Sequence, residues 1–450
     1  MPENKIDSLA EAKSLNNQAV KLFDSGEVSK AISQFEQAYR MGLAGAGQNV
    51  IFSHDYLDHE IGWEAHQRMR REYATTNLPW TRREYANPRT RRKLKIGYVS
   101  ADFCNHSAAW CFGPVLRNHN KDHFEISLFS GTEQLDDQWQ RFAEGADHFV
   151  DIRGLDAETV AQKIQELGID ILVDLSGYSA GNRLDVFALK PVPIQVTAWG
   201  HGGGTGMPQM DYQFSDETFI PDHVSKLFTE TLWNLPCAIP FDPIEFCPPI
   251  QRPPHEENGF ITFGNFGKRS KGNAVTVDTW MRTLAKVPNS RLLLKDGPWE
   301  HTKNRELLDY AAELYNVSSY RIITRGRTSR IQHLQHYADT DIMLDTFPQN
   351  GGVTTWEALW MGVPVITKLG NQPSSRISAA ILTALGLESW ICPSDVPVHE
   401  FAAECSRRDL VAFRRTIRPR IEASPAGCPQ RYTWAVEEAY RAFWSRYIDN

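Results

Sequence analysis

The alternation of apolar, β-rich runs with helical patterns constrains this chain most, because it occurs twice, on either side of a proline-rich segment. That segment, Pro240–Pro254, carries six prolines and no hydrophobic periodicity, which is typical of an interdomain linker. Strand–helix–strand alternation predicts a parallel sheet with helices on both faces. We therefore expect an α/β chain with two doubly wound, Rossmann-like domains that face a cleft, where the carboxyl ends of their strands offer a ligand site.

The two sets of runs predict the individual elements. In the first domain, strands are expected at 95–100, 124–130, 148–152, 170–175 and 194–199, with helices around 110–117, 135–145 and 157–167. In the second domain, strands are expected at 261–265, 291–295, 321–324, 341–345 and 364–367, with helices at 274–286, 302–315, 329–337, 354–361 and 375–384. The chain is thereby divided into a helical tetratricopeptide-like segment (1–78), a linker (79–93), a first Rossmann-like domain (94–245), a proline-rich linker (246–259), a second Rossmann-like domain (260–395) and C-terminal helices that pack back across the domains (396–450).

Both ends of the chain are expected to be helical. Near the N-terminus, small and apolar residues match the spacing of one tetratricopeptide unit, with the glycine at the turn between two helices: Ala19, Gly26, Ala31, Phe35 and Ala38. A single repeat cannot bury its own apolar face, so we expect it to dock on the rest of the chain or on a partner. Near the C-terminus, we expect the aromatic residues to be packed: Trp434, Tyr440, Phe443 and Trp444.

Composition excludes several classes of protein. With 450 residues, 41% hydrophobic and 23% charged, the chain is globular and too long for one hydrophobic core. The formal net charge of −7 predicts no general attraction to nucleic acid or to an anionic membrane. Seven scattered cysteines without a CxxC pair predict neither a disulfide framework nor a structural zinc site. Since no apolar run approaches membrane-spanning length, we expect a cytoplasmic protein without a nucleic-acid or membrane partner.

The strongest local signal for chemistry is the segment 344–367, LDTFPQNGGVTTWEALWMGVPVIT. A buried strand is expected to end at Asp345, and a helix to begin near Thr354 after a glycine-rich turn. Gly351 and Gly352 are expected to adopt positive φ and to let the backbone approach a ligand closely. The helix N-terminus then offers N–H groups and its positive dipole end to a phosphate. The alternative is an ordinary N-capped helix.

The same helix carries three further polar side chains. The hydroxyls of Thr354 and Thr355 would add hydrogen-bond donors for a phosphate. Glu357 would accept hydrogen bonds from a ribose diol, and the alternative is that it only offsets the helix dipole.

Two pairs of residues are expected near this segment. Lys268 and Lys271 follow the strand at 261–265, where a lysine can neutralise a diphosphate leaving group; a solvated basic turn is the alternative. Arg330 and His333 lie three residues apart on one expected helix and face the same way, so both could contact a nucleotide. For this second pair, a plain surface face is the alternative.

In the first domain, DFCNHSAAW directly follows the strand at 95–100. His106 is therefore expected on the first strand-to-helix loop, at the rim of the cleft, where histidine is suited to proton transfer near neutral pH. Capping of the next helix is the alternative for His106. A second glycine-rich loop, WGHGGGTG at 199–206, is denser in glycine than packing alone explains, so we expect a ligand or peptide to approach it at His201 and Gly202.

Six segments now appear in one order: IGYVSADFCNH, DILVDLSGYSAGNRLDVFALKPVPIQV, MDYQFSDETFIP, FGNFGKRSK, DIMLDTFPQNGGVTTWEALWMGVPVIT and SRISAAILTALGL. Together they resemble the protein O-GlcNAc transferase/SPINDLY family, inverting enzymes that glycosylate Ser and Thr of proteins. The resemblance covers about residue 49 to the C-terminus, and family members carry tetratricopeptide arrays at their N-termini. It implies a GT-B-like fold and metal-independent transfer of a sugar, GlcNAc above all, from a nucleotide sugar such as UDP-GlcNAc to a Ser or Thr hydroxyl of a protein or peptide. No cofactor or metal is expected.

Matched residue by residue, the resemblance also implies roles. His106 matches the active-site histidine of the family's DF-x-NH motif, and Lys271 matches the lysine that contacts the donor diphosphate. Thr354 matches a phosphate-binding threonine, and Glu357 matches the acidic residue on the ribose. Lys268 falls where the animal enzymes have a glutamine.

Near the expected nucleotide, several residues differ from those that the family carries. Arg330 and His333 match a lysine and a histidine beside the base and ribose. Gly352 and Val353 replace a histidine and a threonine of the animal O-GlcNAc transferases, and Trp110, counted with the acceptor side of the cleft, stands where those enzymes have a second histidine. GGVTTWE is nearer the SPINDLY-type GTTTTCE pattern, whose plant members use GDP-fucose.

Several functions therefore stay open at the level of sequence. Within the family, a GDP-fucose-dependent protein O-fucosyltransferase and an Asn-glucosyltransferase are alternatives to transfer of GlcNAc. Outside it, a sugar-nucleotide epimerase on the same fold would have no protein acceptor, and a non-catalytic module would only bind peptides.

Overall fold

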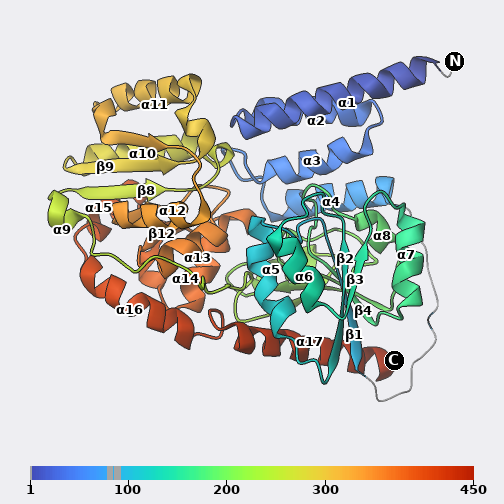
Figure 1. The fold of residues 1–450 in the computed structure, drawn as a ribbon. Helices are drawn as coiled ribbons and strands as arrows, with labels where there is room; N and C mark the ends of the chain where they lie inside the picture. The colour runs from blue at the N-terminus through green and yellow to red at the C-terminus, as the bar shows by residue number, and fades with distance from the viewer. Residues whose placement is uncertain (1–2, 79–84, 86–92, 450) are drawn as a thin grey trace. The chain divides into compact units, whose positions relative to one another are not determined.

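The structure, a computed structural model, describes residues 3–78, 85 and 93–449. These residues divide into two compact units, each built on one parallel sheet (Figure 1). Within the described residues, unit 1 comprises 3–46, 53–61 and 243–424, and unit 2 comprises 47–52, 62–242 and 425–449. Apart from Tyr85 and Lys93, the linker predicted at 79–93 lies outside the described residues.

Unit 2 contains a seven-stranded parallel sheet in the order β3-β2-β1-β4-β5-β6-β7. Its strands are β1 (Leu94–Ser100), β2 (Phe124–Ser130), β3 (His148–Asp151), β4 (Ile171–Asp174), β5 (Ile194–Thr197), β6 (Tyr212–Ser215) and β7 (Thr231–Asn234). The central strands β4 and β5 are buried along their whole length, because helices cover both faces of the sheet. The strand order reverses between β1 and β4, so the loop that carries His106 after β1 lies at the switch point of this sheet.

The helices of unit 2 cover both faces of its sheet, with α5 and α6 on one side and α7 and α8 on the other (Figure 1). Their bounds are α5 (Ser107–Asn118), α6 (Asp137–Gly145), α7 (Ala157–Glu166), α8 (Leu184–Ala188) and the 3-10 helix η1 (Asp222–Leu227). Asp136 and Asp156 cap α6 and α7 by accepting hydrogen bonds from backbone N–H groups. Two helices from distant parts of the chain complete the unit, α4 (Trp63–Asn77) and α17 (Pro429–Asp449).

Unit 1 contains a six-stranded parallel sheet in the order β10-β9-β8-β11-β12-β13. Its strands are β8 (Ile261–Asn265), β9 (Ser290–Lys295), β10 (Ile322–Arg325), β11 (Ile342–Leu344), β12 (Val365–Lys368) and β13 (Ile391–Cys392). Here the order reverses between β8 and β11.

The helices of unit 1 also lie on both faces of the sheet, and Figure 1 shows α10 and α11 on one side and α12 and α13 on the other. Beyond the helices of its N-terminal residues, the α-helices of unit 1 are α9 (His255–Asn258), α10 (Ala274–Lys286), α11 (Thr302–Leu314), α12 (Arg330–Gln335), α13 (Val353–Trp360), α14 (Ile377–Ala384), α15 (Val398–Cys405) and α16 (Leu410–Ala423). Short 3-10 helices connect them: η2 (Arg269–Lys271), η3 (Gly297–Glu300), η4 (Ser319–Arg321), η5 (His336–Asp339), η6 (Pro373–Ser375) and η7 (Glu388–Trp390).

The N-terminal segment of unit 1 is a helical hairpin. α1 (Glu3–Asp24) and α2 (Val28–Arg40) are joined by a turn at Gly26, whose φ of +87° is readily adopted only by glycine. The hairpin buries small and apolar side chains, among them Ala19, Ala31 and Phe35. The next helix, α3 (Ala44–His54), contains residues of both units.

The predicted α/β class with two doubly wound sheets is confirmed, and every predicted strand and helix of the two sheets is present. The sequence pattern missed β6, β7, β13, α3, α8 and α9, because these elements are short or carry too many polar and glycine residues to show a period; α9 lies within the predicted linker at 246–259. Among the C-terminal aromatic residues, Tyr440 and Phe443 are buried as predicted. The prediction for Trp434 was wrong, because its side chain is 63% exposed on the outer face of α17.

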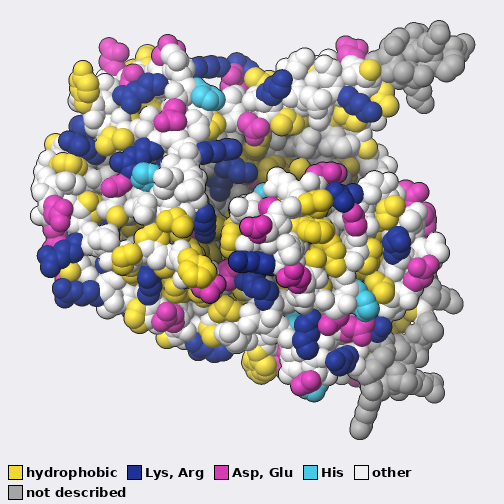
Figure 2. All heavy atoms as spheres, viewed as in Figure 1, with side chains coloured by type: hydrophobic (Ala, Val, Ile, Leu, Met, Phe, Trp, Pro, Cys, Tyr) yellow, Lys and Arg dark blue, Asp and Glu magenta, His cyan; other side chains and the backbone are white. Residues whose placement is uncertain are grey.

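The surface shows no large area of one charge on the face drawn in Figure 2, where acidic and basic side chains are interspersed. Within the described residues, no helix is both long enough and apolar enough to cross a membrane.

Candidate active site

The loops that follow β8 and β11 bring the predicted phosphate-binding residues of unit 1 together. The two strands are neighbours in the sheet, and their loops flank the point where the strand order reverses, which is where doubly wound sheets bind ligands. Lys271 lies in η2 after β8, and Asn350 lies in the loop after β11. The Nζ of Lys271 donates a hydrogen bond of 2.6 Å to the carbonyl oxygen of Asn350.

The carboxylate of Asp345 organises the loop after β11. Its Oδ1 accepts hydrogen bonds from the backbone N–H groups of Thr346 (2.9 Å) and Gly351 (2.8 Å), and its Oδ2 accepts one from the hydroxyl of Thr367 (2.7 Å). Removal from water raises the pKa of Asp345, although these hydrogen bonds and the nearby Lys271 favour the charged form. The loop beside Lys271 is thus wrapped around one carboxylate.

Glycine is needed at position 351 for a reason other than the predicted one. Neither Gly351 nor Gly352 is among the glycines with positive φ, so that expectation was wrong. A Cβ atom on Gly351 would lie 2.7 Å from Oγ1 of Thr354 and 2.6 Å from Oγ1 of Thr355. The missing side chain therefore makes room for two hydroxyl groups at the start of α13.

The N-terminus of α13 has no capping side chain. Gly352 occupies the N-cap position and has no side chain that could accept a hydrogen bond from the first turn. The first N–H groups of a helix have no partner within the helix, and together with the dipole they suit an anion. Thr354 is half-buried beside them, whereas Thr355 is buried and its hydroxyl lies 2.8 Å from the hydroxyl of Ser378.

Arg330 and His333, which begin and continue α12, both contact Glu357 on α13. Nη1 of Arg330 pairs with Oε1 of Glu357, and Nε2 of His333 lies 3.2 Å from Oε2. The hydroxyl of Tyr337 also donates to Oε2, at 3.3 Å. Burial alone would raise the pKa of Glu357, but His333 and Arg330 hold it below its ordinary value. In this structure, Glu357 fixes the positions of the two basic side chains.

The environment of Lys271 changes its acid–base behaviour. The pKa of its ammonium group is lowered to about 8, mainly by removal from water and also by the charge of Lys268, while Asp345 opposes the shift. A diphosphate beside Lys271 would supply negative charge that favours the protonated form of this half-buried group. Lys268 itself is exposed, just before η2.

In unit 2, His106 is both the cap of a helix and an exposed side chain. Its Nδ1 lies 3.3 Å from the backbone N of Ala108, which caps α5, and 3.3 Å from Oδ1 of Asp102. The ring is 45% exposed, and its Nε2 has no hydrogen-bond partner among the described residues. The capping role and a chemical role at Nε2 are therefore compatible. Trp110, one turn further along α5, is half-buried.

Packing accounts for the glycine-rich loop at 199–206. A Cβ atom on Gly202 would overlap the ring of Phe219, and one on Gly203 would overlap the guanidinium of Arg70 from α4. The density of glycine, contrary to the sequence argument, is thus explained without a ligand. His201 itself is half-buried and lies 5.6 Å, between ring centroids, from Phe52.

Sequence reasoning missed three residues of the unit 1 site: Asp345, Tyr337 and Ser378. Ser378 donates to the carbonyl oxygen of Gly351 (3.0 Å) and so supports the loop from α14. Only Asp345 left a signal in the sequence, as a carboxylate directly after a buried strand. Across the described part of the chain, no group of three or more His, Cys, Asp or Glu side chains could hold a metal ion.

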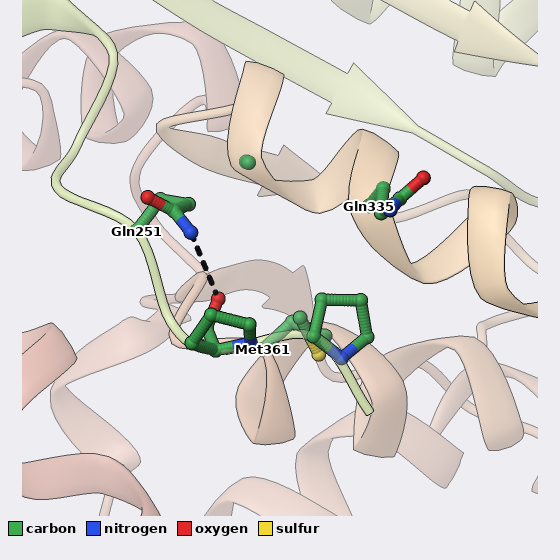
Figure 3. A pocket seen from close by; sticks show the side chains of 6 residues that line it. Gln251, Gln335 and Met361 are labelled. Carbon is green, nitrogen blue, oxygen red and sulfur yellow. Dashed lines mark hydrogen bonds between the residues drawn. The ribbon is translucent and has the colours of Figure 1, made fainter. Parts of the chain in front are cut away.

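A small pocket of unit 1 lies beside these helices. Figure 3 shows Gln335 from α12 on one side of it and Gln251 and Met361 on the other. The pocket has a volume of about 170 Å³, and the remaining lining residues are Pro248, Pro249 and Ala338. Since no charged side chain lines it, this pocket is not suited to a diphosphate.

Known proteins match most of this chain. Residues 75–240 and 255–426 match Glycosyl transferase family 41. A probable UDP-N-acetylglucosamine–peptide N-acetylglucosaminyltransferase SPINDLY of Oryza sativa is 31% identical over 421 residues, which are 90% of this chain and 45% of the rice protein. The SPINDLY protein of Hordeum vulgare, named in the same way, is 31% identical over 90% of this chain and 44% of its own length. This chain therefore spans less than half the length of these curated relatives.

A solved structure is also similar. A mutant of the Thermobaculum terrenum O-GlcNAc transferase superposes with a TM-score of 0.91 at 27% identity, covering 97% of this chain and 85% of that one. The likeness extends over both sheets and the helices around them, so the GT-B-like fold is shown for the chain as a whole.

Proposed function

This chain belongs to glycosyl transferase family 41, and from that premise we propose that it transfers a sugar from a nucleotide sugar to a Ser or Thr hydroxyl of a protein or peptide. One observation carries the proposal. Lys271 lies at the switch point of the unit 1 sheet, bonded to the Asn350 carbonyl and next to the uncapped N-terminus of α13. A lysine and a helix N-terminus are the groups that a diphosphate without a metal needs.

The reaction is a direct displacement with inversion at the anomeric carbon. The acceptor oxygen forms a bond to this carbon while the bond to the diphosphate oxygen breaks, and the diphosphate leaves with the bonding electrons. Lys271, the hydroxyl of Thr354 and the first N–H groups of α13 stabilise the charge that develops on it. The acceptor proton passes to a base, and the exposed Nε2 of His106 is our candidate for orienting the hydroxyl or accepting that proton.

Arg330, His333 and Glu357 have the chemistry to bind the nucleoside. The imidazole of His333 packs against the rings of Phe266 and Tyr337, which leaves a preformed group of aromatic and basic side chains beside the diphosphate loop. The names of the curated relatives specify UDP-N-acetylglucosamine, which favours UDP-GlcNAc as donor. GDP-fucose is the alternative, because Gly352 and Val353 depart from the animal enzymes.

Binding and transfer can be tested separately. We expect UDP to raise the melting temperature of the full chain, because a ligand that binds only the folded state stabilises it. UDP-GlcNAc with a library of Ser- and Thr-containing peptides should then give glycosylated peptide and free UDP. Stabilisation by GDP alone would point to the fucosyl donor, consumption of the donor without an acceptor would point to an epimerase or hydrolase, and binding without any turnover would leave a peptide-binding module.

A further inference from the structure

The turn of the N-terminal hairpin rests on the 3-10 turn that carries Lys271. A Cβ atom on Gly26 would overlap Nη1 of Arg269 and lie 2.8 Å from its Cζ, so the hairpin turn and this guanidinium are in direct contact. Next to the glycine, Glu27 forms an ion pair with Lys303 of α11. The single hairpin, which cannot bury its own apolar face, therefore packs on the rest of unit 1.

Arg269 is held too firmly to be a surface residue that happens to touch the hairpin. Its side chain is buried, with Cζ 4.5 Å from the centroid of the Trp299 ring. Nε donates to Oδ1 of Asn304 (3.0 Å), and Nη1 donates to the carbonyl oxygen of Gly272 (2.8 Å). The guanidinium thus connects η2 to η3 and α11.

Two further contacts, made by Leu57 and Glu60 after α3, connect the N-terminal residues of unit 1 with the loops around Lys271. Nδ2 of Asn273, which caps α10, donates to the carbonyl oxygens of Leu57 (3.1 Å) and Phe347 (2.9 Å). The carboxylate of Glu60 accepts a hydrogen bond of 2.5 Å from the backbone N of Asn371, and another from Ser375. The backbone N of Asn350, whose carbonyl oxygen binds Lys271, in turn donates to the carbonyl oxygen of Ser374 (2.9 Å).

We propose that the N-terminal segment of this chain is part of the donor site, where it positions the ammonium group of Lys271 through Arg269. Arg269 and Lys271 belong to the same three-residue turn, so a displaced guanidinium shifts the turn from which Lys271 extends. The hairpin contributes to donor binding in addition to any contact with an acceptor. This inference rests on the proposed function, since it assigns the diphosphate to Lys271.

The test compares two variants that disturb the contact from opposite sides. Arg269→Met removes the guanidinium but keeps an apolar stem over Trp299, and Gly26→Ala displaces the guanidinium without changing any residue of the donor loops. For both variants we expect the UDP dissociation constant from calorimetry to rise by about tenfold or more. The KM for the donor should rise in parallel, while the KM for the acceptor stays unchanged. Lys271 should also become more accessible, measured as faster acetylation of its peptide by mass spectrometry.

Two controls separate positioning from general destabilisation. Arg282→Met removes a guanidinium that also lies over a ring of unit 1, Tyr315, but belongs to α10 and does not contact η2. Ile417→Ala lowers the stability of unit 1 by removing a buried side chain of α16. Both variants should bind UDP with wild-type affinity, and their Lys271 should be acetylated at the wild-type rate.

Wild-type UDP affinity and wild-type acetylation of Lys271 in folded Arg269→Met and Gly26→Ala proteins would overturn the inference. If the wild type binds neither UDP nor GDP, the proposed function fails. The acetylation measurement still decides whether the hairpin positions Lys271, because it needs no nucleotide.

Discussion

At the scale of single residues, Lys271 connects the electrostatics of unit 1 with the proposed chemistry. Within the described residues, its ammonium group donates a hydrogen bond only to the neutral carbonyl of Asn350. Its pKa is lowered to about 8. A half-buried cation of this kind, without a charged hydrogen-bond partner, costs free energy until an anion arrives, so its surroundings favour a diphosphate over water.

Replacement of Lys271 should separate binding from folding. In Lys271→Ala we expect kcat to fall by about 100-fold to 1000-fold, because one group that stabilises the leaving diphosphate is lost. UDP binding should weaken as well, while the circular dichroism spectrum stays unchanged. Lys286→Ala is the control, since this lysine lies at the end of α10 and pairs with Glu400; turnover of the Lys271 variant at the wild-type rate would contradict the assignment.

The same residue predicts a pH dependence of donor binding. Lys271 is protonated below about pH 8 and loses its charge as the pH rises through that value, because its pKa in the folded protein is lowered. UDP binding requires the ammonium form, so the dissociation constant should rise by up to about tenfold per pH unit above pH 8. Calorimetry between about pH 6.5 and pH 9.5 would measure this slope. Lys271→Met should bind UDP weakly at every pH and show no such slope, and a wild-type affinity that is constant across this range would contradict the prediction.

His106 should affect turnover without affecting the donor. His106→Ala is expected to bind UDP with wild-type affinity and to lose about 100-fold in kcat, the usual scale for a lost acid–base group. Because His106 also caps α5, His106→Asn serves as the control that keeps a capping side chain. If both variants turn over at the wild-type rate, His106 is only a helix cap.

At the scale of elements, the diphosphate loop depends on a close fit between Gly351 and α13. The loop is held by Asp345 on one side and by Ser378 on the other, and its glycine leaves space for the hydroxyls of Thr354 and Thr355. A side chain at this position has to move either the loop or the N-terminus of the helix, and both belong to the proposed donor site.

Gly351→Val should therefore weaken UDP binding. Overpacking of this kind costs about 1–3 kcal/mol, and where that cost falls on the donor-binding arrangement of the loop it corresponds to roughly 5-fold to 150-fold in the dissociation constant. Gly45→Ala in α3 is the control, because an added Cβ there meets no atom within 4 Å. Unchanged UDP affinity in Gly351→Val would show that the loop does not contact the diphosphate.

At the scale of the whole molecule, neither unit is one continuous stretch of the chain. Unit 2 is completed by α17, the last helix, whose Phe443 stacks on Tyr212 of β6 with ring centroids 3.7 Å apart. On the same helix, the hydroxyl of Tyr440 lies 3.0 Å from that of Tyr98 on β1. Unit 1 likewise combines the N-terminal hairpin with residues 243–424.

The strand and helix pattern was predictable because it depends on local periodicity, and the proline-rich segment at 240–254 marked the break between two such patterns. Most residue types of the diphosphate loop were also visible, since Gly351, Thr354 and Glu357 lie close together in the sequence, whereas Asp345 was recognised only as the end of a strand. Lys271 joined them only through the family resemblance, because nothing in the local sequence distinguishes it from a lysine in a solvated turn.

The sequence by itself determined the α/β class, the two sheets and the residue types available for binding a diphosphate. Only the tertiary structure decided which partners those residues have: Lys271 with the Asn350 carbonyl, Glu357 with Arg330 and His333, and Gly26 with Arg269. It also showed that Gly351 is needed for space rather than for its backbone angle. The physical reason is range, since backbone periodicity arises between near neighbours in the chain, whereas packing and hydrogen bonding join residues that only the folded backbone brings into contact.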